Sequence, residues 1–256
     1  MGSGRAAAAG GSGSAAPAVM VRVSGGRLNL QLAAGELCVI FGREDAGTSE
    51  LLRGIVGHSR IADTRIEVLG MALGALRPGD MVALRRRIGY VFRETGLLSN
   101  MTLEENVALP VRYHTSLSGP AIAERVHALL DRFGLTEVRH HRPADVDHFI
   151  RKRAAFARAL TLDPDILLAD YPLEGLDPVG AARMAEIMTE VAERPGRLFV
   201  VATCELGPYA SLDGRFLMFE GGELLWQGHR GELAAVTHAA VRQFLDRSTA
   251  GPLATF

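Results

Sequence analysis

The stretch Glu36–Glu50, ELCVIFGREDAGTSE, decides the fold. Its opening residues, Glu36–Phe41, form a compact apolar run of the kind that a strand buried on both faces requires. A glycine-containing turn follows and leads into Ser49–Val56, where the spacing of apolar residues predicts a helix. A buried strand, a turn and a helix in this order open a β-α-β unit, so the stretch predicts a parallel sheet.

The rest of the chain repeats this alternation. Gly221 and Gly222 separate two strand-like runs and predict a final hairpin. The block from Leu103 to Leu160 has helical periodicity, most clearly over Ile122–Phe133 and Arg151–Leu160, so we expect a helical lobe inserted between strands. The pattern predicts an α/β fold with a mainly parallel sheet, a small antiparallel β part and this lobe. The other expected strands are 19–23, 28–32, 66–69, 88–92, 166–169, 198–202, 216–219 and 223–227.

Composition narrows the classes of partner. The chain has 256 residues, 48% of them hydrophobic, which is enough for a sizeable core. Lys and Arg number 28 against 29 acidic residues, and this balance argues against nucleic acid, because phosphate binding relies on a basic excess. Cys38 and Cys204 lie in apolar runs, which favours a reducing, cytoplasmic compartment over a disulfide framework or a zinc site. No apolar run reaches the roughly 18–20 residues of a spanning helix, so a membrane is reached only through a partner.

The first 18 residues are rich in Gly, Ala and Ser and lack the apolar centre of a signal peptide. We expect residues 1–18 to form a flexible tail. Met20 stands directly before the first strand-like run and is an alternative natural start to Met1.

The turn Gly42–Glu50 follows the phosphate-binding pattern G-x-x-x-x-G-K-[ST] only in part. Gly42, Gly47 and Ser49 match the pattern, and Thr48 stands where the lysine belongs. Two glycines at this spacing also suit an ordinary strand–turn–helix connection. The loop alone therefore does not decide between a phosphate site and a simple turn.

Two further segments follow in order. Asp165–Asp170, DILLAD, has the form of a Walker B strand, whose final aspartate lies near the Mg²⁺ of a bound nucleotide. Ile150–Leu160 is IRKRAAFARAL, and Gly175–Pro178 is GLDP. Together with the loop, these segments resemble the nucleotide-binding domains of ATP-binding-cassette (ABC) transporters, in which GLDP is the D-loop and residues 150–160 correspond to the helix after the signature.

The resemblance implies a P-loop NTPase (RecA-like) core. A finer resemblance, to the ATPase subunits of MCE-type lipid transporters such as the maintenance-of-lipid-asymmetry (Mla) system, rests on Ile88–Val107, Arg112–Val126, Arg151–Arg153 and Val241–Leu253. We expect Arg151–Arg153 to form a solvated or subunit-facing surface. The implied divisions are a tail at 1–18, the core at 19–93 and 163–232, the helical lobe at 94–162 and a C-terminal extension at 233–256.

Four positions that carry function in the family hold other residues. Without the lysine, position 48 cannot neutralise phosphate charge, and Glu44, Asp45 and Glu50 add repulsion of about 4 kcal/mol for a pair of charges about 4 Å apart at an effective dielectric constant of about 20. Without the glutamate after Asp170, no carboxylate positions the attacking water. The substitutions are Thr48 for the P-loop lysine, Arg93 for the Q-loop glutamine, Tyr171 for the catalytic glutamate and Cys204 for the switch histidine.

The signature, LSGGM or LSGGQ in the family, is replaced by Val146–Ile150, VDHFI. Its serine and glycines let the backbone approach the nucleotide of the opposite subunit, which bulky or acidic side chains obstruct. The changed positions are Asp147, His148, Phe149 and Ile150. No aromatic residue precedes Phe41 to stack on adenine. We therefore expect a pseudo-ATPase that needs no ATP, Mg²⁺ or other metal, with Gly42, Gly47, Ser49 and Asp170 as vestiges of the site.

Three hypotheses for the function follow. The first is a catalytically degenerate, structural or regulatory subunit that docks on the integral-membrane permease of an MCE/Mla-like lipid transporter. It would sit in the cytoplasm, peripheral at the inner face of the plasma membrane, beside a second nucleotide-binding subunit in a homodimer or heterodimer. The second is a working ATPase in which Arg43 or Arg93 replaces the lysine. The third is a free-standing regulatory module of ABC fold.

The C-terminal extension carries one apolar stripe. Val241, Phe244 and Leu245 recur at the i, i+3 and i+4 positions of a helix. In the family this tail reaches the other subunit, so the resemblance implies a dimer contact through these residues. The alternative is that the stripe folds back on its own domain.

Overall fold

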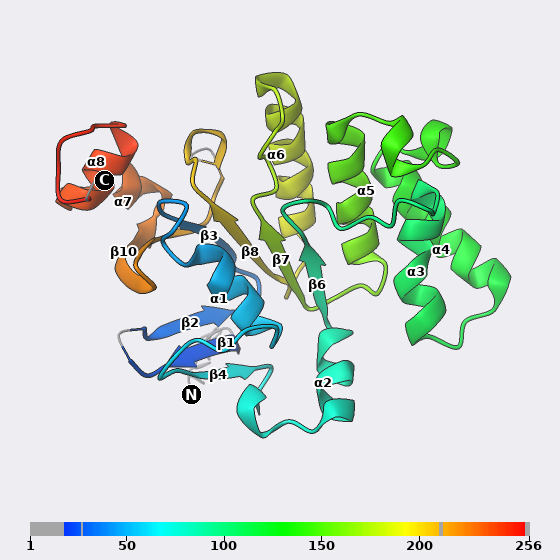
Figure 1. Cartoon of the computed structure of the whole chain (residues 1–256), viewed down its shortest axis with the longest axis horizontal. Helices are drawn as coiled ribbons and strands as arrows, with labels where there is room; N and C mark the ends of the chain where they lie inside the picture. Colours follow the sequence, from blue (N-terminus) through cyan, green and yellow to red (C-terminus); the bar gives the residue numbers. More distant parts are fainter. Residues whose placement is uncertain (1–17, 27, 210–211, 254–256) are drawn as a thin grey trace, which may run out of the picture.

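The computed structural model of the chain describes residues 18–26, 28–209 and 212–253. The predicted tail, apart from Ala18, lies outside these residues. Two sheets with helices around them make up the architecture (Figure 1). In the described ranges, no helix has the length and apolar character that crossing a bilayer requires.

A six-stranded sheet in the order β10–β9–β3–β8–β7–β6 forms the centre of the fold. Its strands run parallel except for the edge strand β10, which pairs with β9 in the antiparallel sense. This arrangement confirms the predicted α/β class with a mainly parallel sheet. The strands are β3 (Leu37–Phe41), β6 (Ile88–Val91), β7 (Ile166–Asp170), β8 (Leu198–Thr203), β9 (Arg215–Glu220) and β10 (Glu223–His229).

A second, antiparallel sheet has the order β2–β1–β4–β5. It corresponds to the small antiparallel part that the sequence predicts. The strands are β1 (Val19–Ser24), β2 (Leu30–Ala33), β4 (Arg65–Val68) and β5 (Met71–Ala72). The helical segment after it begins with a short 3-10 turn, η1 (Leu73–Ala75), and continues in α2 (Pro78–Arg85).

The central sheet is buried on both faces, because alternate residues of its strands belong to two different apolar clusters. In β3, Cys38 and Ile40 pack with α1 (Thr48–Ile55) and the antiparallel sheet. Val39 and Phe41 face the opposite cluster. That cluster also contains residues of α3 (Leu103–His114), α4 (Gly119–Arg132), α5 (His148–Leu160) and α6 (Pro178–Ala192). Apolar burial on both faces explains the continuous apolar runs of the strand sequences.

The expected helical block divides into α3, α4 and α5, which lie together beyond the β6 edge of the sheet (Figure 1). Thr102 and Glu105 form a capping box that starts α3. In the first part of α3, the Asn106 side chain accepts from the Leu98 amide at 2.7 Å and donates to the Leu98 carbonyl at 3.1 Å. These bonds fix the loop between β6 and α3. The remaining short helices are η2 (Thr136–Val138), η3 (Pro143–Asp145), η4 (Gly207–Tyr209), α7 (Arg230–Ala234) and α8 (Ala239–Leu245).

Candidate functional site

The glycine-containing loop joins the carboxyl end of β3 to α1. Gly47 is the N-cap of α1, with a φ of 90° and no side-chain cap, so the first backbone amides of the helix face the loop. Gly42 has no room for a side chain, because a Cβ there would collide with the carbonyl oxygen of Phe219. The two glycines therefore shape a turn whose geometry suits an anion.

Ser49 and Asp170 meet at the carboxyl ends of β3 and β7. Ser49 Oγ donates to Asp170 Oδ1 at 2.6 Å, and Tyr90 Oη donates to Oδ2 at 3.1 Å. Burial, and then the Asp170 charge, raises the pKa of Tyr90, so this phenol remains a donor at neutral pH. A Ser hydroxyl and a Walker B carboxylate are the protein groups that hold Mg²⁺ in P-loop NTPases. This pair of hard oxygen donors fits that ion.

Two of the substituted positions contact each other. Thr48 Oγ1 and Tyr171 Oη lie 3.3 Å apart, and both residues are buried. Tyr171 has a φ of 48°, a conformation that bulky residues rarely adopt. Burial raises the pKa of Tyr171, so its side chain is an uncharged phenol at neutral pH. Two changes that look independent in the sequence therefore form one buried contact.

Arg93 lies between two carboxylates beside this contact. It donates to Glu174 through Nε at 2.5 Å and through Nη2, and Nη2 also donates to Glu44 Oε1 at 2.8 Å. Its guanidinium carbon lies 4.4 Å from the centre of the Tyr171 ring. The hydrogen bond from Arg93 lowers the pKa of Glu174. A loop carboxylate expected only to repel phosphate is thus paired with a cation.

Arg43 pairs with carboxylates on the other side of the loop. Its Nη2 lies 2.8 Å from Glu220 Oε1 and 3.4 Å from Asp45 Oδ2. A second acidic side chain of the loop is therefore also paired. The two arginines named as substitutes for the missing lysine both flank the loop, and they face different partners.

Lys152 lies beneath these residues and is fully buried. Its Nζ donates to the Arg93 carbonyl at 2.8 Å and to the Tyr171 carbonyl at 3.1 Å, so it ties the end of β6 to the end of β7. Burial lowers its pKa from 10.5 to about 8. The expectation of a solvated or subunit-facing surface at Arg151–Arg153 is wrong for Lys152, because the ammonium caps two inward carbonyls that have to be satisfied.

The altered signature forms the start of α5. Asp147 is the N-cap of α5 and accepts from the Ile150 amide at 2.8 Å. His148 Nε2 lies 3.1 Å from the Glu174 carbonyl oxygen, and the guanidinium carbon of Arg153 lies 4.7 Å from the centre of the Phe149 ring. A cavity of about 440 Å³ separates this turn from the D-loop; it is lined by Asp147, His148, Phe149, Gly175, Leu176, Asp177, Val179, Gly180 and Arg183. His148 and Phe149 therefore line this cavity with side chains, where the glycines of the family's signature would expose only backbone.

Cys204 directly follows β8, at the same edge of the sheet as Asp170. It is a half-buried free thiol. Burial raises its pKa, so it remains protonated at neutral pH and cannot take the acid–base role of a histidine.

A model described as "ABC transporter" matches residues 26–174, which is more than half of the chain. The chain belongs to the ABC transporter family. It is 35% identical over 201 residues to the methionine import ATP-binding protein MetN 2 of Paraburkholderia xenovorans, covering 78% of this chain and 52% of that protein. It is 32% identical over 222 residues to MetN of Haemophilus influenzae, covering 87% of this chain and 64% of that protein. The chain thus spans between about half and two thirds of the length of these relatives.

Solved structures share the fold at lower identity. The cbiO1 protein of Clostridium perfringens, part of the ABC transporter complex cbiONQ, superposes with a TM-score of 0.76 at 23% identity, covering 85% of this chain and 91% of that one. A dimeric ATP-binding cassette in a post-hydrolysis state, bound to ADP and Pi, superposes with a TM-score of 0.73 at 24% identity and covers 84% and 97%. These likenesses confirm the P-loop NTPase fold.

The family assignment corrects one expectation and leaves another without support. The expectation that the chain needs no cofactor is wrong: it belongs to the ABC transporter family, and its curated relatives are named ATP-binding proteins. The curated relatives described above are named for methionine import rather than lipid transport, so the finer resemblance to MCE-type subunits gains nothing from them.

The C-terminal stripe of this ABC cassette packs on its own domain. Val241 is fully buried in the core, and Phe244 lies 5.4 Å, centroid to centroid, from Phe41 of β3. Leu245 is partly buried against the same cluster. The structure thus shows the stripe in contact with its own domain, which is the alternative to a dimer contact. A dimer contact through Val241, Phe244 and Leu245 stays a prediction.

Three site residues escaped the sequence analysis. Tyr90 and Glu174 lie outside the phosphate-loop pattern, and their contacts with Asp170 and Arg93 join residues 80 or 81 positions apart. No local pattern reports such a distance. Lys152 does leave a signal: it is the only lysine of the chain, which otherwise uses arginine. A compact ammonium and a planar guanidinium are not interchangeable, so the lone lysine is a position to note.

Proposed function

We propose that the chain is the ATP-binding subunit of an ABC transporter and that it binds ATP with Mg²⁺ through a non-standard set of residues. The hydrogen-bonded pair of Ser49 and Asp170 carries the proposal. Ser49 lies in the first turn of α1 and Asp170 ends β7, and together they would hold the metal ion. The backbone of residues 42–49 would surround the phosphates. Bound Mg²⁺ supplies charge neutralisation of the phosphate oxygens.

The pairing of the loop carboxylates supports ATP binding. Glu44 and Asp45, which oppose a triphosphate when considered alone, are each within 3.4 Å of an arginine. Each arginine reduces the repulsion that its neighbouring loop carboxylate exerts on a phosphate. The offset is partial, because Arg43 is shared with Glu220 and Arg93 with Glu174. The lysine charge at position 48 is still missing.

Calorimetry with ATP and Mg²⁺ tests the proposal. We expect saturable binding that weakens without Mg²⁺ and in the variants Ser49→Ala and Asp170→Asn. Ser116→Ala is the matched control, because Ser116 is exposed between α3 and α4, outside the loop. The absence of saturable heat at millimolar ATP in the wild-type protein would refute the proposal.

A second candidate function is an ATP-binding subunit that hydrolyses ATP very slowly and acts as a structural or regulatory component. The contact between Thr48 and Tyr171 favours it, because a neutral phenol stands where a carboxylate would position water. Phosphate release under single-turnover conditions measures how fast bound ATP is hydrolysed. Release as fast as that of an ABC cassette with the standard residues would exclude the slow candidate. Release within about tenfold of the uncatalysed rate is what that candidate predicts.

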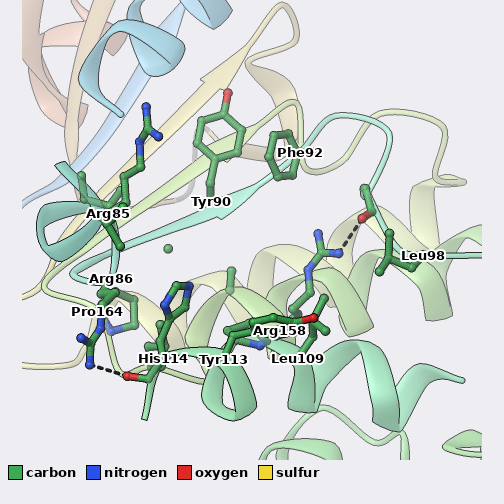
Figure 2. Close-up of a pocket in the computed structure, with 17 residues that line it drawn as sticks. Arg85, Arg86, Tyr90, Phe92, Leu98, Leu109, Tyr113, His114, Arg158 and Pro164 are labelled. Atoms are coloured by element: carbon green, nitrogen blue, oxygen red, sulfur yellow. Dashed lines mark hydrogen bonds between the residues drawn. The ribbon is translucent and has the colours of Figure 1, made fainter. Parts of the chain in front are cut away.

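A groove beside the site supports a membrane partner. It has a volume of about 610 Å³ and lies between the β6 edge and the helical lobe (Figure 2). Four of the eight exposed large apolar side chains in the described ranges line it. They are Val82, Phe92, Leu98 and Tyr113, and Tyr113 is 79% exposed. A monomeric surface rarely gathers such side chains without a partner.

The partner that we propose for the groove is a cytoplasmic helix of the transporter's permease. Phe92 directly precedes Arg93. Arg93 stands at the position of the family's Q-loop glutamine, which senses the membrane subunit. Arg86 and Arg158 edge the groove and donate to the His114 and Thr95 carbonyls, so an acidic residue on the permease helix would complement the rim. The subunit would then act at the cytoplasmic face of the membrane. The names of the relatives favour a small-solute importer, with methionine as the first solute to test, over a lipid transporter.

A further inference from the structure

The residue at the Q-loop position, Arg93, is the cation whose contacts span both sides of the phosphate loop. Its guanidinium joins Glu44 on the loop to Glu174 before the D-loop. Its Nε and Nη2 each donate to one carboxylate oxygen of Glu174, so the contact is bidentate. A guanidinium held in this way presents the fork geometry that also matches phosphate oxygens.

The backbone of Arg93 is fixed, while its head group remains accessible. Lys152 Nζ donates to the Arg93 carbonyl at 2.8 Å and anchors it from below. The Arg93 side chain is 32% exposed, and Glu44, its partner on the loop, is 72% exposed. The guanidinium can therefore exchange partners without moving its own backbone.

The same guanidinium lies over the contact that replaces the standard pair of residues. Arg93 is 4.4 Å from the centre of the Tyr171 ring, and the Tyr171 hydroxyl meets Thr48 at 3.3 Å. The Thr48 side chain is short and uncharged. The position of the missing lysine and the guanidinium of Arg93 are thus separated by a single aromatic ring.

The other candidate cations are less suited to a phosphate. Arg43 is drawn toward Glu220 of β9, on the far side of the loop from Asp170 and Tyr171. Lys152 is buried, and its ammonium is directed to two backbone carbonyls. Arg93 is the arginine that contacts the loop, the residue after Asp170 and the residue before the D-loop together.

We propose that Arg93 supplies the phosphate-binding cation in place of the lysine missing at position 48, and that Glu44 and Glu174 hold it when no nucleotide is bound. The proposal rests on the ATP-binding function proposed above. The ligand class is a nucleoside di- or triphosphate with Mg²⁺. On binding, the guanidinium exchanges carboxylate oxygens for phosphate oxygens, and the two glutamates become competitors of the ligand.

The proposal predicts that substituting Arg93 weakens the binding of ATP–Mg²⁺ and that substituting Glu44 tightens it. Arg93→Gln places the family's own residue at the position and nevertheless weakens binding of ATP–Mg²⁺ by at least about tenfold, because a charge-assisted hydrogen bond is lost. Arg93→Lys retains part of the affinity. Glu44→Gln tightens binding, because it removes both a competitor and a negative charge. Arg77→Gln is the matched control, since Arg77 is exposed at the start of α2 and pairs with Asp80.

The test is calorimetric titration of the folded variants with ATP–Mg²⁺ and with AMP at two salt concentrations, with circular dichroism to verify folding. We expect Arg93→Gln to lose affinity for ATP and to leave the weaker binding of AMP unchanged. Equal affinity of wild type and Arg93→Gln for ATP, or tighter binding by Arg93→Gln, overturns the role of Arg93 alone. Absence of ATP binding in the wild type overturns the proposed function and this inference together. If Arg93→Gln does not fold, Glu44→Gln decides: unchanged or weaker ATP binding in that variant overturns the proposal.

Discussion

The Thr48 hydroxyl lies 3.3 Å from the Tyr171 hydroxyl, in a buried contact between the loop after β3 and the residue after β7. Each residue stands where the family has a charged side chain of opposite sign. In this chain the two positions hold uncharged side chains that touch each other. Residues in contact are expected to be coupled energetically, and the coupling has measurable consequences.

Thr48→Lys alone should destabilise the protein by about 1–3 kcal/mol, because the longer, charged side chain would meet the Tyr171 ring at a buried position. Adding Tyr171→Glu should recover part of this loss, with a coupling of about 0.5–3 kcal/mol between the two positions. Urea denaturation of the wild type, both single variants and the double variant measures the coupling. Thr48→Ser, which keeps the hydroxyl, serves as the control. Strictly additive costs would mean that the two residues do not act as a pair.

Leu167→Ala should lower the free energy of unfolding by about 2–5 kcal/mol. Leu167 is fully buried in β7, between β6 and β8, and the sheet cannot collapse around the space that the substitution leaves. Leu117→Ala, at a residue that is 43% exposed, should change it by less than about 0.5 kcal/mol. A loss below about 1 kcal/mol for Leu167→Ala would be incompatible with a central strand at this register.

The sequence predicts most of the fold because its strands are buried on both faces. The apolar runs before Gly42 and before Asp170 leave no alternative to a parallel sheet, and the structure places both runs at its centre. Within the helical block, the periodicity over residues 122–133 and 151–160 predicts two helices, which correspond to α4 and α5. The bounds of α3 do not follow from the pattern, because Pro110 lies inside α3 although proline usually ends a helix.

The candidate site was predicted less well, for a physical reason. Motif positions such as Ser49 and Asp170 follow from local spacing, and the structure brings them together. The compensating contacts do not follow from spacing: Arg93 meets Glu174 across 81 positions. Charge counted along the loop leaves out the ion pairs that these carboxylates make with Arg43 and Arg93. Substitutions that contact each other in space have to be weighed together.

Lys152 should titrate with a midpoint near 8. Because it is the only lysine of the chain, selective ¹³C-lysine labelling reports its ionisation by NMR without overlap from other side chains. Its ordinary pKa is 10.5, so between about pH 8 and 10.5 the unfolded chain holds a proton that the folded chain has released. Over that window, this group's contribution to the free energy of unfolding rises by up to about 1.4 kcal/mol per pH unit; below about pH 8 it is flat.

Lys152→Met is the reference for this pH dependence. As the pH rises from 8 to 10, the free energy of unfolding of the wild type should increase relative to that of Lys152→Met. A midpoint near 10.5 for the labelled lysine would show that the ammonium is solvated, which contradicts its burial beneath Arg93 and Tyr171.

Tyr113→Asp and Phe92→Ser should weaken co-purification with the permease, because both side chains are exposed in the groove (Figure 2). Tyr113→Asp should also leave ATP binding unchanged. Phe92→Ser is assessed by co-purification alone, because the centre of the Phe92 ring lies 4.6 Å from that of Tyr90, which contacts Asp170. Burying one aromatic ring contributes roughly 1.5–3 kcal/mol, so each variant should raise the dissociation constant at least about tenfold. Leu225→Asp is the control, because β10 forms the opposite edge of the sheet from β6. Equal recovery of the complex with all three variants would locate the permease contact elsewhere.

Truncation after Thr237 should destabilise the subunit as well as affect any dimer. The removed segment contains Val241, which is fully buried in the core, and Gln243, whose side chain accepts from the Leu253 amide at 2.7 Å. Loss of the buried apolar groups should cost about 2–5 kcal/mol. Leu245→Ser, at a partly buried position, separates the two roles, since it disturbs the core less than truncation does. If Val241, Phe244 and Leu245 also form the dimer contact, light scattering should show Leu245→Ser shifting toward monomer, with a smaller fall in melting temperature than the truncation causes. An unchanged oligomeric mass for Leu245→Ser, together with a large loss of stability on truncation, would assign the stripe to its own domain alone.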